Sequence, residues 1–165
     1  MKNLLIVITL FIAIGVKAQT NNFYLDDYKI SWQKNYETSK TKAEVIQHFE
    51  NANIFKKHKV INDTIYGKLV PHETDPNKTG VAGVPQIIND TDFKGVVVII
   101  VTDKEYQVIF SDIVNIGRGD FLKKNEEQAL EITFLKRGKS EYTPGFLKKP
   151  RRIYDATFNE IFLIK

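Results

Sequence analysis

The stretch YKISWQKNYETSKTKAEVIQHF, residues 28–49, combines an alternating segment with a helix start signal. Up to residue 37 the side chains alternate, and one face carries the apolar or aromatic residues Tyr28, Ile30, Trp32 and Tyr36. A period of two with aromatic residues predicts a half-buried strand over 28–37. The next segment, residues 41–44, has the spacing of a capping box and is followed by apolar residues at helical spacing, which predicts a helix from about 42 to about 55.

The rest of the chain predicts more strands and a closing helix. Alternating or β-branched runs predict strands over 60–70, 93–102, 105–116 and 129–135, the second and third forming a hairpin. The run GVVVIIVT, residues 95–102, favours a central place in the sheet. Residues 153–164 place aromatic side chains on one helical face, although their β-branched content leaves a strand open. The order β-α-β-β-β-β-α predicts an α+β fold, a two-layer sandwich whose antiparallel sheet has two helices on one face.

The opening stretch resembles a family of exported bacterial domains of unknown function that is described as having a TATA-binding-protein-like (TBP-like) fold. The similar elements are Trp32 with its alternating neighbours, Tyr36-Glu37-Thr38 at the strand end, and the capped helix. The order of elements matches over about the whole mature chain, whereas the residue-level likeness is confined to the opening. The resemblance implies a shape. It supplies no catalytic residue and does not imply DNA binding.

The N-terminus has the order of a secretory signal peptide. Lys2 precedes an apolar run, residues 4–16, and a small-residue cleavage site follows at Ala18. The run is shorter than the roughly 20 residues that a permanent membrane helix needs. We therefore expect a signal peptide over 1–18, a single mature domain over 19–165 without a permanent membrane span, and a periplasmic or secreted location. The chain has no cysteine, which favours a bacterial protein stabilised by packing and excludes a lipobox anchor.

Positive charge is concentrated in residues 136–152. The whole chain has a formal charge of +4, and removal of Lys2 and Lys17 with the signal peptide leaves +2. The segment alone carries +6, which leaves −4 for the rest of the mature chain. Its basic residues are Lys136, Arg137, Lys139, Lys148, Lys149, Arg151 and Arg152. This uneven field predicts a site for an anionic partner, an envelope glycan or an envelope protein, while the alternative is a solvated loop. The mild overall charge gives no reason to expect nucleic acid.

Catalytic and metal-binding patterns give little support for an enzyme. The three histidines, His48, His58 and His72, share no metal-ligand spacing, and no serine lies in a nucleophile elbow. Residues 75–80 match the start of a calcium loop, but Gln86 stands where its glutamate should be, so a plain surface loop is favoured. We expect no catalytic residue, metal or cofactor. The long connection over 71–92 is expected to be functional or disordered.

Three further motifs have more than one interpretation. Tyr28, Trp32 and Tyr36 could form a carbohydrate-stacking platform, but an aromatic strand face is favoured as core. Arg118-Gly119-Asp120 spells an adhesion tripeptide, and Asp63-Thr64-Ile65 resembles a short O-glycosylation sequon. Together these patterns predict an exported non-catalytic module that binds an envelope partner. The alternatives are a small-ligand carrier with a pocket between sheet and helices, and a hydrolase with an unrecognised site.

Overall fold

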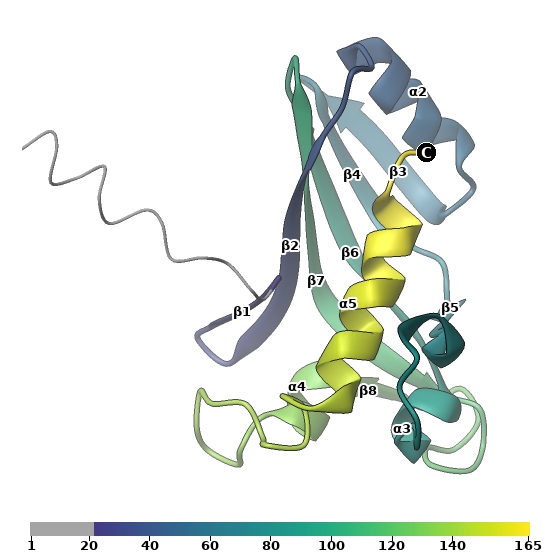
Figure 1. The fold of residues 1–165 in the computed structure, drawn as a ribbon, viewed down its shortest axis with the longest axis vertical. Coiled ribbons are helices and arrows are strands. Elements are labelled where there is room, and N and C mark those ends of the chain that lie inside the picture. The colour runs from purple at the N-terminus through teal and green to yellow at the C-terminus, as the bar shows by residue number, and fades with distance from the viewer. Residues whose placement is uncertain (1–21) are drawn as a thin grey trace, which may run out of the picture.

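The computed structural model describes residues 22–165, and the predicted signal peptide lies outside them. Its main feature is an eight-stranded antiparallel sheet with strand order β1-β2-β7-β6-β4-β3, in which β5 adds to β6 and β8 adds to β7 (Figure 1). The strands are β1 Phe23–Asp26, β2 Lys29–Glu37, β3 Phe55–Ile61, β4 Thr64–Leu69, β5 His72–Glu73, β6 Thr91–Val101, β7 Glu105–Gly117 and β8 Glu127–Ala129. The helices are α2 Lys42–Asn51, α3 Gln86–Asn89, α4 Leu130–Phe134 and α5 Lys149–Phe162, with a 3₁₀ turn η1 Pro76–Thr79.

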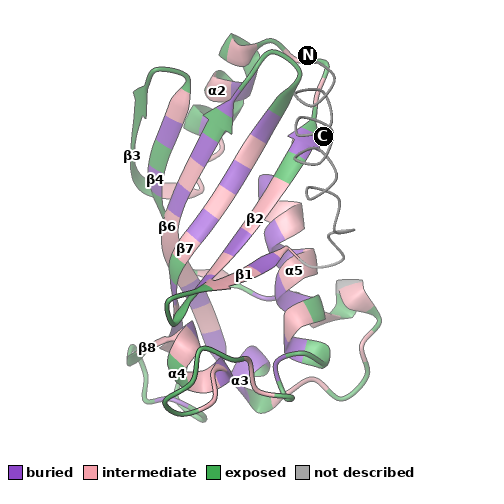
Figure 2. Ribbon diagram, turned by 90° about the vertical axis from the view of Figure 1, so that its left-hand side faces the viewer, coloured by how far each residue is buried: buried purple, intermediate pink, exposed green. Residues whose placement is uncertain are grey.

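The two longest helices, α2 and α5, lie on the same face of the sheet. Tyr106 of β7 shows this directly, because its ring contacts Phe49 of α2 at 5.5 Å and its hydroxyl donates to the Phe162 carbonyl of α5 at 2.9 Å. Figure 2 shows both helices on one side of the sheet, with the strands alternating between buried and less buried residues. The α+β sandwich predicted from the sequence is therefore confirmed. Within residues 22–165, no helix combines the length and the apolar character that crossing a membrane requires.

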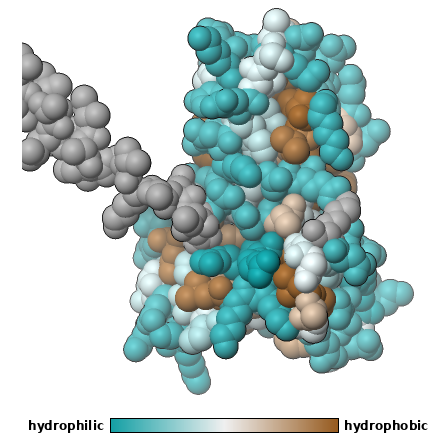
Figure 3. Space-filling view, in the orientation of Figure 1, coloured by the Kyte–Doolittle hydropathy of each residue, from teal (hydrophilic) through white to brown (hydrophobic). Residues whose placement is uncertain are grey.

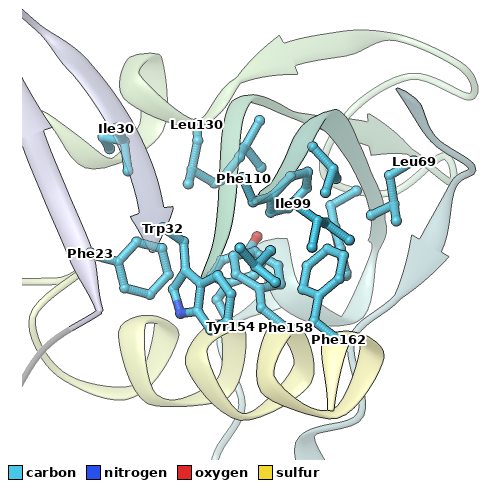
Figure 4. Packing of buried hydrophobic residues seen from close by; sticks show 14 of the residues in the cluster. Phe23, Ile30, Trp32, Leu69, Ile99, Phe110, Leu130, Tyr154, Phe158 and Phe162 are labelled. Atoms are coloured by element: carbon cyan, nitrogen blue, oxygen red, sulfur yellow. The ribbon is translucent and has the colours of Figure 1, made fainter. Parts of the chain in front are cut away.

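Aromatic rings fill the space between the sheet and α5. Phe158 of α5 contacts Trp32 of β2 at 5.8 Å, Phe110 of β7 at 4.9 Å and Phe93 of β6 at 5.0 Å (Figure 4). Trp32 is fully buried, so the prediction that its strand face is core is confirmed. Tyr28 is an exception, because it lies in the β1–β2 turn with φ 63° and is 51% exposed.

The capping box is confirmed, but the segment after the helix was predicted wrongly. Thr41 accepts a hydrogen bond from the backbone N–H of Glu44, and the Glu44 carboxylate accepts from Thr41 in return. The helix ends at Asn51, short of the expected end near residue 55, and the strand β3 that begins at Phe55 was expected only from residue 60. The single strand predicted over 60–70 is instead the end of β3 and all of β4, joined by a turn in which Asn62 and Asp63 have positive φ. Asn and Asp tolerate this left-handed backbone, which lets the chain reverse within two residues.

The strand predicted over 129–135 is also wrong, since only the three residues of β8, Glu127–Ala129, are extended and α4 follows. Leu130 and Phe134 are buried, as either a strand or a helix would require. Ile132 distinguishes the two, because a strand would bury it with them and it is 69% exposed. Residues 71–92 are not a plain loop, since they contain β5, η1 and α3. The closing helix is confirmed, but it begins at Lys149 and so includes part of the basic segment.

Candidate anion-binding groove

The first half of the basic segment forms a small hairpin that we call the tip, residues 135–142. Leu135 forms an isolated antiparallel bridge with Tyr142, and the backbone N–H of Lys136 donates to the Glu141 carbonyl at 2.9 Å. Gly138 closes the turn with φ 70°, a conformation that side-chain-bearing residues rarely adopt. The turn presents Arg137 and Lys139 to solvent.

Aromatic packing fixes the tip to the core. Tyr142 stacks on Phe146 at 4.9 Å, and Phe146 contacts Phe134 of α4 at the same distance. Phe146 is fully buried and also meets Phe23 of β1 edge to face at 5.2 Å. The buried anchors on its C-terminal side give this basic loop a defined position.

The tip, the β1–β2 turn and helix α4 together line an open groove, here called the tip groove, of about 460 Å³. The backbone N–H of Tyr28 donates to Ser140 Oγ at 3.4 Å, which joins segments 112 residues apart in the chain. The lining residues are Tyr28, Glu131, Ile132, Leu135, Lys136, Arg137, Gly138 and Lys139. Figure 3 shows apolar side chains among hydrophilic ones in the lower left of the molecule, where Figure 1 places this loop. The groove thus combines exposed apolar surface with cations.

Of the three cations in the tip groove, Lys136 forms the closest contact with an acid, and Lys139 has only a weaker interaction with the same Glu141 carboxylate. Lys136 pairs with Glu141, and this hydrogen bond holds the pKa of the Glu141 carboxyl below its usual value. Glu131 Oε1 accepts from the backbone N–H of Ile30 at 3.0 Å. Arg137 and Lys139 form no ion pair with any residue that the structure describes. A positive field therefore remains at the mouth of the groove.

The other four basic residues lie around the first turn of α5 and do not line the tip groove. Lys149 has a structural role, because its Nζ donates to the carbonyls of Ala82 and Gly83 at 2.6 and 2.9 Å. Arg151 lies near Tyr142, where burial raises the pKa of the hydroxyl to about 12 and the guanidinium opposes that rise. The first turn of α5 contains no acidic residue. Its cations thus lie at the positive end of the helix dipole, where they are unfavourable.

The remaining motifs have structural partners in the fold. Arg118 is held by Glu73 at 2.9 Å and Asp92 at 3.6 Å, so the adhesion tripeptide does not present a free arginine. Asp75 Oδ1 accepts from the backbone N–H of Asn77 at 3.1 Å, as in an ordinary turn. Thr64 of the sequon is half-buried in β4. Among residues 22–165 no three His, Asp or Glu side chains come together as a metal site.

Sequence reasoning did not find Tyr28 and Ile132 as groove residues. Each was assigned to the apolar face of a strand, and each is exposed because the backbone departs from a strand at that point. The sequence does contain a signal that Tyr28 lies in a turn, because the preceding Asp26-Asp27 pair has a composition that is frequent in turns.

Comparison with solved structures decides the fold type. A TBP-like protein from Parabacteroides distasonis matches with a TM-score of 0.53 and 20% identity, covering 84% of this chain and 94% of the other. The fold is TBP-like. A DUF4468 family protein from Bacteroides ovatus matches with a TM-score of 0.47 and 16% identity, covering 88% of this chain and 93% of that one. No protein-family model matches the chain, and no curated protein matches its sequence.

The TBP-like fold agrees with the expectation from the opening stretch. At this level of identity the likeness shows a shared backbone fold. Function has to be inferred from the side chains of this chain.

Proposed function

We propose that the protein is an exported, non-catalytic module that binds an acidic glycan of the cell envelope through the tip groove and the neighbouring basic residues. The observation that carries the proposal is the meeting of Tyr28 and Ile132 with Arg137 and Lys139 in one open groove. Aromatic faces stack on sugar rings, and the cations complement carboxylate or phosphate groups on the polymer.

The charges on α5 support an anionic partner of some length. Lys148 and Arg152 are exposed at the positive end of a helix, and neither pairs with an acid among the described residues. Natural sequences keep locally unfavourable residues, such as cations at the start of a helix, mainly at functional sites. A polymer, in contrast to a small anion, is able to contact both the tip and the start of α5.

The two alternative functions receive less support from the geometry. A ligand carrier needs space between the sheet and the helices, and aromatic rings fill the region between Trp32, Phe110 and Phe158. A hydrolase needs convergent titratable groups. The acidic residue that lines the tip groove, Glu131, already accepts from a backbone amide, and Glu141 of the tip pairs with Lys136.

Retention on a heparin resin at low salt tests the binding surface. The double variant R137Q/K139Q should elute at clearly lower salt than the parent protein, because two exposed cations that attract the polymer are lost and salt screens the attraction of those that remain. The control K123Q/K124Q removes two exposed lysines from the β7–β8 connection and should elute with the parent. Tyr28→Ala should weaken binding to an acidic polysaccharide without changing how binding depends on salt. Equal elution of all variants would contradict the proposal.

Export has its own test. N-terminal sequencing of protein recovered outside the cytoplasm should show a chain that begins at Gln19. A membrane-retained chain that still begins at Met1 would contradict export by signal-peptide cleavage.

A further inference from the structure

Strand β3, Phe55–Ile61, is an open edge of the sheet. The strand order ends at β3, which pairs with β4 on one side. Figure 2 shows β3 at the left margin of the molecule with no described element beyond it. Residues 56–61 are all exposed. Because backbone groups of a strand point alternately to its two sides, about half of the N–H and C=O groups of β3 face solvent and are able to pair with another chain.

This edge carries an uncompensated positive charge. Lys57 lies directly opposite Lys68 of β4, and Lys59 lies opposite Tyr66, with its Nζ 5.5 Å from the ring centroid. Like charges in opposite positions destabilise a sheet. None of these three lysines pairs with an acid among residues 22–165. Glu50 of α2 lies 4.0 Å from His58 of this strand.

An apolar floor lies between the lysines. Lys57, Lys59 and Lys68 line a shallow groove of about 330 Å³ together with Tyr66 and Val96. Residues opposite one another in an antiparallel pair share a face, so these side chains all lie on the sheet face away from α2 and α5. The groove shares no lining residue with the tip groove.

We propose that β3 binds an acidic, extended peptide as an added strand of the sheet. The open backbone groups are able to pair with main-chain groups of an added strand, which a peptide supplies and a lipid surface does not. The lysines select acidic side chains on the incoming strand. Pairing of β3 with β3 of a second copy would place lysines against lysines, so a self-complementary dimer through this edge is disfavoured.

The alternation of β3 sets the pattern that the peptide must have. Lys57 and Lys59 lie on one face of the strand, while His58 and Val60 lie on the other. Acidic residues two positions apart would lie opposite the two lysines. Apolar residues between them would lie opposite His58 and Val60, the latter 36% exposed. The preferred ligand therefore alternates acidic and apolar residues.

The test uses the purified protein and an end-blocked, dye-labelled octapeptide that alternates glutamate and valine. Fluorescence anisotropy should show saturable binding, and hydrogen exchange should slow in β3 when the peptide is present. Substitution of both lysines, K57Q/K59Q, should weaken binding at least tenfold, whereas K123Q/K124Q should not change it. A peptide with glutamine in place of glutamate should bind at least tenfold more weakly than the acidic one.

Several results would overturn the proposal. Equal affinity of the parent and K57Q/K59Q would remove the role of the lysines. Binding without slower exchange in β3 would exclude strand addition. Absence of peptide binding together with binding to phosphatidylglycerol vesicles would identify a lipid surface. Absence of peptide binding together with self-association of K57Q/K59Q would show that the lysines only protect the edge from aggregation.

Discussion

The indole Nε1 of Trp32 donates to Oδ1 of Asp155 at 2.7 Å, and this bond joins strand β2 to helix α5. The side-chain amide of Asn22 donates to the same oxygen, also at 2.7 Å. One carboxylate thus connects the first described residue, the second strand and the last helix. The Trp32 ring also contacts Phe158 and Phe162, so Trp32 contributes both packing and a hydrogen bond to the contact between β2 and α5.

Replacing Trp32 with alanine should lower the free energy of unfolding by about 3–5 kcal/mol, the usual cost of truncating a large buried aromatic residue. Chemical denaturation measures the change. The matched control is Ile132→Ala, since Ile132 is 69% exposed and its loss should change stability by no more than about 0.5 kcal/mol. Similar stabilities for the parent and Trp32→Ala would mean that the ring does not support the core.

The capping box of α2 makes a pH-dependent contribution to stability. Hydrogen bonds from the Thr41 hydroxyl and backbone lower the pKa of the Glu44 carboxyl from its ordinary 4.5. The stabilisation is therefore complete above about pH 4.5 and is lost as the pH falls through the lower pKa of the folded state. Thr41→Ala should cost about 0.5–2 kcal/mol at pH 7. Glu44→Gln should be less stable than the parent at pH 7, and the difference should shrink towards pH 3. A difference that is constant with pH would contradict this assignment.

The sheet and its aromatic core were predictable because their patterns are long. The β-branched run of residues 95–102 and the alternation around Trp32 each repeat over several residues, so a central strand and a buried face followed directly. The errors fell where a short pattern fits two structures. The burial of Leu130 and Phe134 fits either a strand or a helix. The exposure of Ile132 distinguishes the two, and it is known only from the structure.

The tip groove could not be predicted from the sequence, because it depends on a contact between distant segments. The backbone N–H of Tyr28 donates to the side-chain hydroxyl of Ser140 across 112 residues. The sequence did show the density of positive charge in residues 136–152. It did not show that three of the seven basic residues line the groove while Lys149 donates to the carbonyls of Ala82 and Gly83.

Removing the hydroxyl of Tyr142 should stabilise the protein. The Tyr142 hydroxyl is buried and has no hydrogen-bond partner within the part of the chain that the structure describes. An unsatisfied buried group costs on the order of 1 kcal/mol or more, so Tyr142→Phe should raise the free energy of unfolding by about 1 kcal/mol at pH 7.

The same variant should also respond less to alkaline pH. Burial raises the pKa of Tyr142 from 10.0 to about 12. The hydroxyl therefore ionises at lower pH in the unfolded protein than in the folded one, and the folded state loses stability as the pH rises from 10 to 12. Tyr142→Phe should lose less stability than the parent between pH 10 and 12. A lower stability of the variant at pH 7 would indicate that the hydroxyl has a bound partner.

Reversing the charge at Arg152 should stabilise helix α5. A cation in the first turn opposes the helix dipole and an anion complements it, by about 0.3–1 kcal/mol each. Arg152→Glu should therefore raise the melting temperature at low salt, and 1 M salt should reduce the gain. Arg137→Glu makes the same charge change at the tip, outside any helix, and should leave the melting temperature almost unchanged. Equal changes in melting temperature for the two variants would show that the net charge of the protein, and not the dipole of α5, causes the change.

Helix α5 follows every strand of the sheet in the chain, and this order constrains how the protein folds. While the polypeptide emerges from N- to C-terminus, the strands that carry Trp32, Phe93 and Phe110 are complete before Phe158 and Phe162 are available to cover these rings. A nascent chain that stops before residue 149 would expose these rings to water and to other chains. Completion of the core thus waits until synthesis is nearly finished.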